Sequence, residues 1–228
     1  MGDPKPIGSA LAPWIAAARA RSPTLDSPEL VARRERFFAE REQDRLKLLR
    51  EIAELRGVPV AREWELLSRT DPGGSAVRAV SDALAWRACQ PEGTPLVLVL
   101  SSAPGVGKSV ALRHAVTQAP PSARYVLSHR FASLVEWKNE ELFRSLRAVK
   151  LLALDEFGLE RDPAPVSQLL VERWDAGLIT LVATNLGIED LDKRLDARVL
   201  DRVEEQRLGG MDWLVLLSEA SRRTGGAT

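Results

Sequence analysis

The chain has 228 residues, of which 45% are hydrophobic, and its 32 basic and 32 acidic side chains give a formal net charge of zero. This length and hydrophobic content are enough for one substantial core with a smaller appendage. The neutral balance excludes a global electrostatic attraction to nucleic acid, so any DNA contact must come from a local patch.

The single cysteine, Cys89, excludes a disulfide within the chain, and with only His114 and His129 beside it a structural zinc site is not expected. No run approaches the roughly 20 continuous apolar residues of a membrane span. The first residues, Met1 to Pro6, lack the apolar core of a secretion signal. A cytoplasmic protein that does not contact a membrane is therefore expected.

A long charged helix is expected after a proline-rich start. Five prolines fall within the first 28 residues, which predicts a partly ordered tail. The triplet Ser27-Pro28-Glu29 then provides an N-cap, a proline in the first turn and an early acid. These signals predict a helix that runs to Arg56 and stops at Gly57.

The apolar face of this helix is intermittent, because residues 40–45 are almost wholly polar. One interpretation is a solvated helix that packs only at its two ends. The other is an arm whose Phe37-Phe38 pair binds a partner. Further helices are expected over 61–68 and 75–88, with a turn at residues 71–74 between them. Residues 1–90 are thus predicted to form an N-terminal helical region, which on the second interpretation binds a partner.

Strands and helices alternate after residue 90, which favours an α/β domain with a three-layer parallel sheet over residues 91–228. Four strands are expected, over 96–100, 124–128, 150–154 and 178–184. Helices are expected over 108–118, 131–137, 139–147 and 165–174, and again through the charged segment 188–207.

A phosphate-binding loop follows the first predicted strand, where residues 102–109 read S-A-P-G-V-G-K-S. Gly105 and Gly107 let successive backbone N–H groups turn toward a phosphate, and Lys108 supplies a mobile cation. Ser109 offers its hydroxyl to Mg²⁺ at a helix N-terminus. The loop departs from the pattern G-x-x-x-x-G-K-[ST] at Ser102, where the first glycine is expected.

Paired acids end the third predicted strand, because residues 151–156 read L-L-A-L-D-E. Asp155 is assigned to the Mg²⁺ water shell, and Glu156 is assigned to orienting and deprotonating the attacking water. Asn185, at the end of the fourth strand, is placed to bond the γ-phosphate or that water. The predicted nucleotide-binding residues are Pro104, Gly105, Val106, Gly107, Lys108, Ser109, Val110 and Asp155, of which Ser109 and Asp155 serve the metal.

These segments resemble the AAA+ ATPases of the DnaC and IstB group over about residues 81–223. The resemblance is carried by S-A-P-G-V-G-K-S, L-L-A-L-D-E-F-G and V-E-R-W-D-A-G-L-I-T-L-V-A-T-N-L. The last of these, which contains Arg173, looks like the sensor region of that group. The closing Ser221-Arg222-Arg223 is similar to its S-x-R element, which makes Arg222 a weaker candidate for the nucleotide site.

The run L-D-A-R-V-L-D-R at 195–202 is similar to the segment that carries an arginine finger in helicase loaders. The resemblance implies that Arg202, or as a second choice Arg198, reaches the ATP held by a neighbouring subunit. The alternative is an exposed helix whose arginines pair with nearby acids.

The resemblance implies an ATP- and Mg²⁺-dependent ATPase that self-associates through its arginine finger and loads or remodels the replicative helicase during DNA replication. Two alternatives remain open. One is an IstB-like transposition helper, which the neutral charge disfavours because wrapping duplex DNA requires a broad basic surface. The other is a nucleotide-dependent regulatory module with little turnover.

Single-stranded DNA is a further candidate partner. DnaC-like proteins often carry a longer helical insertion than the residues 128–149 that fill that position here. Within this segment, His129-Arg130-Phe131 and Trp137-Lys138 each place a cation beside a ring that a base can stack on. The alternative is that these are ordinary residues of amphipathic helices.

Overall fold

The computed structural model describes residues 28–59, 67–69, 72–119, 122–136 and 140–218. The predicted proline-rich tail, most of the predicted 61–68 helix and the closing Ser221-Arg222-Arg223 lie outside these ranges. Contacts divide the chain into two compact units, Met1–Leu48 and Leu49–Thr228.

Helix α2 (Pro28–Leu55) contributes residues to both units and confirms the predicted charged helix. Phe37 and Phe38 are 51% and 60% exposed, and their rings contact each other edge to face at 5.9 Å. Arg41 lies over the Phe37 ring, 5.3 Å from its centroid. Both rings are therefore largely exposed, and the role of this region as a partner-binding arm stays a prediction.

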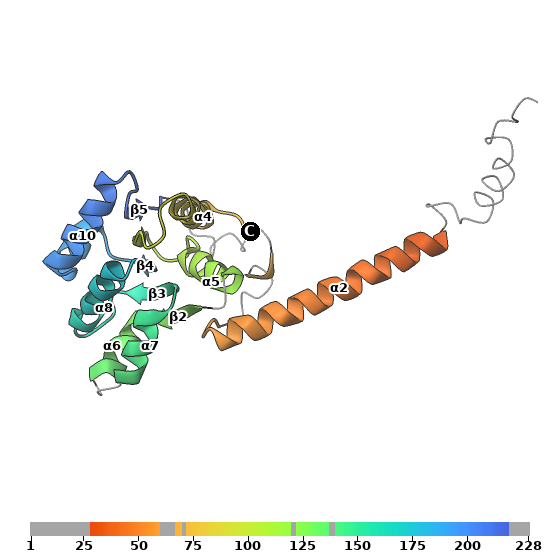
Figure 1. The fold of residues 1–228 in the computed structure, drawn as a ribbon, viewed down its shortest axis with the longest axis horizontal. Coiled ribbons are helices and arrows are strands. Elements are labelled where there is room, and N and C mark those ends of the chain that lie inside the picture. Colours follow the sequence, from red (N-terminus) through yellow and green to blue (C-terminus); the bar gives the residue numbers. More distant parts are fainter. Residues whose placement is uncertain (1–27, 60–66, 70–71, 120–121, 137–139, 219–228) are drawn as a thin grey trace, which may run out of the picture. The chain divides into compact units, whose positions relative to one another are not determined.

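The second unit contains a five-stranded parallel sheet in the order β2-β3-β4-β1-β5 (Figure 1). The four predicted strands are present within a few residues of their expected bounds. The fifth strand was not predicted, and it forms because a short apolar segment pairs with the edge of β1. The strands are β1 (Leu96–Ser101), β2 (Ala123–Leu127), β3 (Leu151–Phe157), β4 (Ile179–Thr184) and β5 (Leu214–Leu216).

Helices cover both faces of the sheet, which gives the predicted three layers (Figure 1). One face packs against α4 (Ser75–Ala88) and α5 (Lys108–Gln118). The other face packs against the helices that follow β2. Along β1 the side chains alternate between the two cores. These helices are α6 (Ser128–Glu136), α7 (Glu140–Ala148), α8 (Ala164–Asp175), α9 (Ile188–Arg194) and α10 (Ala197–Leu208).

Helix α4 packs on α5 and belongs to the same core as the sheet, although it precedes residue 90. The packing boundary near Leu48 therefore differs from the predicted division of the chain at residue 90. The predicted role of residues 1–90 as a partner-binding region concerns function, and it stays a prediction.

The charged segment after β4 is helical as expected, and it forms two helices, α9 and α10. Leu195 is extended at the C-terminus of α9, and the Asp196 side chain caps α10 by accepting from the Arg198 backbone N–H at 2.8 Å. An N-cap aspartate of this kind starts a new helix by satisfying one of its free N–H groups.

Arg56, just after α2, fixes the helix that begins at the phosphate loop. Its guanidinium is buried and donates to the carbonyls of Val116 and Ala119 at 2.5 and 2.8 Å, at the C-terminus of α5. A cation at this end of a helix satisfies free carbonyls and complements the helix dipole. The Arg56 carbonyl also accepts from the Tyr125 N–H at 2.9 Å, which ties the same segment to the edge strand β2.

Arg173, in the segment that resembles a sensor region, has a structural role. It is fully buried, and its guanidinium donates to the Thr180 hydroxyl and to the carbonyls of Leu146, Val149 and Ile179 at 2.6–2.9 Å. Burial lowers the pKa of Arg173 to about 9, so it remains charged at neutral pH. Thr180 and Ile179 begin β4, so Arg173 holds the amino edge of the sheet together and lies away from the strand ends that carry the predicted site.

Candidate functional site

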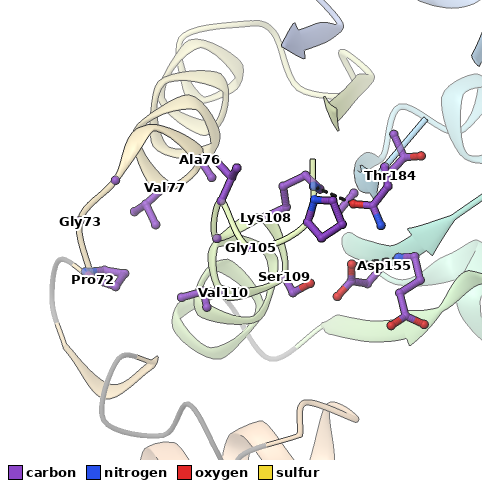
Figure 2. A pocket seen from close by; sticks show the side chains of 17 residues that line it. Pro72, Gly73, Ala76, Val77, Gly105, Lys108, Ser109, Val110, Asp155 and Thr184 are labelled. Atoms are coloured by element: carbon purple, nitrogen blue, oxygen red, sulfur yellow. Dashed lines mark hydrogen bonds between the residues drawn. The ribbon is translucent and has the colours of Figure 1, made fainter. Parts of the chain in front are cut away.

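A cavity of about 330 Å³ opens at the carboxyl edge of β1, β3 and β4, where Figure 2 shows Lys108, Asp155 and Thr184 close together. Parallel strands place their carboxyl ends at one edge of the sheet, and open α/β sheets bind ligands there. The cavity wall comes from the loop and the start of α5, from the ends of β3 and β4, and from the segment before α4 with its first turn. The lining residues are Pro72, Gly73, Gly74, Ala76, Val77, Pro104, Gly105, Val106, Gly107, Lys108, Ser109, Val110, Asp155, Glu156, Ala183, Thr184 and Asn185.

All of the predicted nucleotide-binding residues line this cavity, together with Glu156 and Asn185. Sequence reasoning missed the residues at 72–77, which it interpreted only as a turn and the start of a helix. The signal was the run Pro72-Gly73-Gly74, in which both glycines have positive φ (72° and 99°) and bring the backbone to the cavity wall.

The loop has the backbone conformation that its glycines predict. Gly105 and Gly107 have φ of 95° and 104°, and Gly107 is the N-cap of α5 with no side-chain hydrogen bond to the helix. The first N–H groups of α5 therefore face the cavity without a capping side chain, as an anion site requires. Ser102 is accommodated because it does not take positive φ, and its backbone N–H donates to the Thr184 carbonyl at 3.4 Å.

Lys108 is folded back onto the loop. Its ammonium donates to the Ser102 carbonyl and hydroxyl at 2.8 and 2.7 Å, to the Ala103 carbonyl at 3.0 Å and to the Asn185 side-chain oxygen at 3.0 Å. Burial lowers the pKa of Lys108, and the negative charge of Asp155 opposes this shift. The residue that replaces the first glycine, Ser102, thus adds a side-chain partner for the lysine.

The paired acids occupy different environments. Asp155 is 3% exposed, and its two oxygens accept from the Tyr125 hydroxyl at 2.5 Å and from the Glu156 backbone N–H at 2.9 Å. The Glu156 side chain is 45% exposed, and its carboxylate lies 3.4 Å from the His129 ring. One acid is therefore held inside the protein and the other faces the open cavity.

Backbone geometry separates these two side chains. The pairing of β3 with β4 is irregular between Leu154 and Phe157, and Glu156 has φ of 59°. Irregularities of this kind re-aim side chains next to functional sites, and a non-glycine residue at positive φ marks stored backbone strain. Among the described residues it is the only non-glycine with positive φ.

A buried carboxylate pins the loop that follows the acids. Glu160 accepts from the Gly158 N–H at 2.8 Å and from the Ser128 hydroxyl, and it pairs with Arg194 at 3.3 Å. The three partners belong to the loop after β3, the start of α6 and the end of α9. Gly158 is favoured here because its φ of 104° is one that side-chain-bearing residues rarely adopt. The loop after Glu156 is therefore rigidly anchored.

The two arginines assigned to the finger do not line the cavity. Arg202 pairs with Asp175 at 3.1 Å, and Arg198 pairs with Asp196 at 3.0 Å. Both lie on α10, in the ion pairs that the alternative interpretation of this run expects. Their action on a neighbouring subunit stays a prediction.

Of the two interpretations of Phe131, the structure excludes a ring that stacks on a base and supports an ordinary residue of an amphipathic helix. Phe131 is fully buried in the core and stacks on Phe143, with ring centroids 5.9 Å apart. Trp137 and Lys138 lie outside the described residues. In the described part of the chain no helix is both long enough and apolar enough to cross a membrane.

No protein-family model matches the chain, and no curated protein matches it. Among solved structures, a crystal structure of DnaI is similar with a TM-score of 0.50 and 19% identity, over 68% of this chain and 93% of DnaI. The AMPPCP-bound DnaA from Aquifex aeolicus is similar with a TM-score of 0.51 and 19% identity, over 72% of this chain and 53% of DnaA. The chain thus spans about half the length of that DnaA. These likenesses confirm the predicted fold, an α/β fold with a three-layer parallel sheet, here preceded by the long helix α2.

Proposed function

We propose that this chain binds ATP with Mg²⁺ in the cavity and hydrolyses it. The observation that carries the proposal is that Lys108, Asp155, Glu156 and Asn185 converge with the bare N-terminus of α5 on one cavity. A loop cation and free N–H groups suit the β- and γ-phosphates, and the acids differ in burial as a metal ligand and a general base should.

The donor set also suits Mg²⁺, because the Ser109 hydroxyl and the Asp155 carboxylate are the hard oxygen ligands that this ion prefers. When bound, the ion neutralises charge that develops on the phosphates. Glu156 faces the cavity and accepts the proton of the attacking water. Asn185, already within hydrogen-bond distance of Lys108, holds the γ-phosphate or that water. Lys108 exchanges its loop carbonyls for phosphate oxygens.

Replacing Lys108 by alanine is expected to weaken ATP binding about 10- to 100-fold, because charge-assisted hydrogen bonds contribute about 1.5–3 kcal/mol. The measurement is a titration with a fluorescent ATP analogue, followed by anisotropy. Lys193→Ala is the matched control, since that lysine lies on the surface in an ion pair with Asp190. Equal affinities for the Lys108→Ala and Lys193→Ala variants would show that the nucleotide does not bind in this cavity.

We further infer that the ATPase acts in DNA replication and loads or remodels the replicative helicase. The support is the motif resemblance to helicase loaders together with the likeness in fold to DnaI and DnaA. Residues 1–90 are proposed to hold the helicase, and the exposed Phe37-Phe38 pair on α2 is the surface offered to it. Self-association through Arg202 is proposed to link ATP to assembly. A contact with single-stranded DNA now depends on residues other than Phe131.

The partner proposal is tested with the full chain, because residues 49–90 pack in the same unit as the ATPase. Wild-type protein with ATP is expected to capture the replicative helicase of the host, and the double variant Phe37→Ser, Phe38→Ser is expected to lose it. Leu208→Ser is the control, because Leu208 is 79% exposed on α10. Capture of a transposase instead would establish the transposition alternative, and undiminished helicase capture by the double variant would refute the role of this pair.

A further inference from the structure

Tyr125 and Arg113 lie directly behind Asp155, and no motif singled them out. The Tyr125 hydroxyl donates to Asp155 Oδ2 at 2.5 Å and accepts from Arg113 Nε at 3.0 Å. Arg113 also lies 3.9 Å from the same carboxylate oxygen, and its guanidinium covers the tyrosine ring, 5.2 Å from the centroid. The three side chains form one contact network from α5 through β2 to β3.

The register of the sheet explains how these residues meet. Asp155 pairs with Leu127 on the neighbouring strand, and Tyr125 precedes Leu127 by two positions on β2. Side chains two positions apart on a strand share a face, so Tyr125 is the diagonal neighbour of Asp155, within reach of a long aromatic side chain. Arg113 approaches the same face from α5, which packs on this side of the sheet.

The hydrogen bond between Tyr125 and Asp155 lies inside the protein. Tyr125 and Asp155 are 4% and 3% exposed. A carboxylate at this depth is costly unless both of its oxygens are satisfied. The tyrosine hydroxyl donates to Oδ2, and the Glu156 backbone N–H donates to Oδ1 at 2.9 Å. Rotation of the carboxylate would break one of these bonds, so its orientation is set by Tyr125 on one side and by the backbone on the other.

We propose that Tyr125 is a positioning residue for Asp155, and that its hydroxyl, backed by Arg113, fixes the orientation of the carboxylate that serves Mg²⁺. This rests on the proposed function, which assigns Asp155 to the metal. The hydroxyl accepts from Arg113 on one side and donates to Asp155 on the other, so its direction is fixed by both partners. Tyr125 acts only through Asp155 and does not itself touch the nucleotide.

The first test asks whether the Tyr125–Asp155 bond forms, whatever the chain binds. A double-mutant cycle compares the free energies of unfolding of the wild type, Tyr125→Phe, Asp155→Asn and the double variant, measured by chemical denaturation of the full chain. The effects of the two changes are expected not to add, because each removes the same hydrogen bond. Tyr125→Phe combined with Lys193→Ala is the control and should be additive, because Lys193 is a surface residue paired with Asp190. Additive effects of Tyr125→Phe and Asp155→Asn would overturn the proposal.

The second test asks whether the bond serves the metal. Tyr125→Phe keeps the ring and removes the hydroxyl, and it is expected to raise the Mg²⁺ concentration for half-maximal binding of a fluorescent ATP analogue about 10-fold. Binding of the analogue in EDTA is expected to be unchanged. Thr117→Val is the control, because it removes another buried hydroxyl, which donates to the Arg113 carbonyl at 2.9 Å.

A purely structural role would lower the thermal midpoint of Tyr125→Phe without moving its Mg²⁺ dependence. That result, or an equal Mg²⁺ shift in Thr117→Val, would overturn the proposal. Failure of the wild type to bind the analogue would instead refute the proposed function. The double-mutant cycle still decides whether the Tyr125–Asp155 bond forms in that case, so the two failures are distinguishable.

Discussion

Replacing Glu156 by glutamine is expected to lower ATP turnover about 10²- to 10⁴-fold, the usual contribution of a positioned general base. Glutamine keeps the shape and the hydrogen-bonding reach of the side chain but cannot accept a proton from water. Glu156 is suited to this task because the strand irregularity and its positive φ turn it toward the cavity, where 45% of its side chain is exposed. Asp155, by contrast, is buried and fully hydrogen-bonded.

Binding of ATP should survive the same change, since Glu156 contacts none of the groups that hold Lys108 or the loop. Steady-state phosphate release and analogue binding are measured side by side on the full chain. Glu189→Gln, an exposed acid in the first turn of α9, is the control and should match the wild type in both. A Glu156→Gln enzyme that turns over within about twofold of the Glu189→Gln enzyme would contradict general-base catalysis by this residue.

The fold was largely predictable because its inner strands β1, β3 and β4 are buried on both faces and appear in the sequence as largely apolar runs. The run at 96–100 and the glycines after it locate β1 and the start of α5, and Ser75 and Ala88 bound α4 as expected. Strand β5 was missed because it has three residues, only partly buried, and it forms by pairing with β1, more than a hundred residues earlier. The residues of a short segment do not indicate which distant strand that segment will pair with.

The same distinction applies to the site. Lys108 and Asn185 follow β1 and β4, and Asp155 lies near the carboxyl end of β3, so the topology alone brings them to one edge of the sheet. The residues at 72–77 reach the cavity only because α4 packs on α5. The role of Phe131 stayed open in the sequence because a cation beside a ring does not reveal which face of α6 is buried. Tyr125 carries no motif, and its role follows from the strand register.

Arg202→Ala is expected to lower turnover of the assembled protein about 10³- to 10⁵-fold, the range measured for arginines supplied to a phosphoryl-transfer site. Arg202 does not line the cavity of its own chain, so it can serve only a neighbouring one. Its present partner is Asp175, in an exposed pair whose side chains are 41% and 54% exposed. Pairs of this kind contribute at most about 1 kcal/mol, so releasing the arginine costs little.

Turnover per subunit should therefore rise with protein concentration in the wild type and stay low at every concentration in the variant. Arg207→Ala, which removes another exposed ion pair from α10, is the control and should behave as the wild type. Arg198→Ala distinguishes the second candidate, which is held by Asp196 at 3.0 Å. Turnover that does not change on dilution, and that neither Arg202→Ala nor Arg198→Ala lowers, would refute the arginine finger.

A mixing experiment separates action on a neighbour from action within one chain. Arg202→Ala keeps its own Glu156, and Glu156→Gln keeps its own Arg202, so each variant alone lacks one half of every site. In a mixed assembly, Arg202 of a Glu156→Gln subunit meets the intact Glu156 of an Arg202→Ala subunit, and part of the turnover should return. Arg202 lies on α10 and does not line the cavity of its own chain. A single chain of either variant therefore cannot combine an intact Arg202 with an intact Glu156. Mixtures that stay as inactive as the two variants alone would place Arg202 outside the reaction.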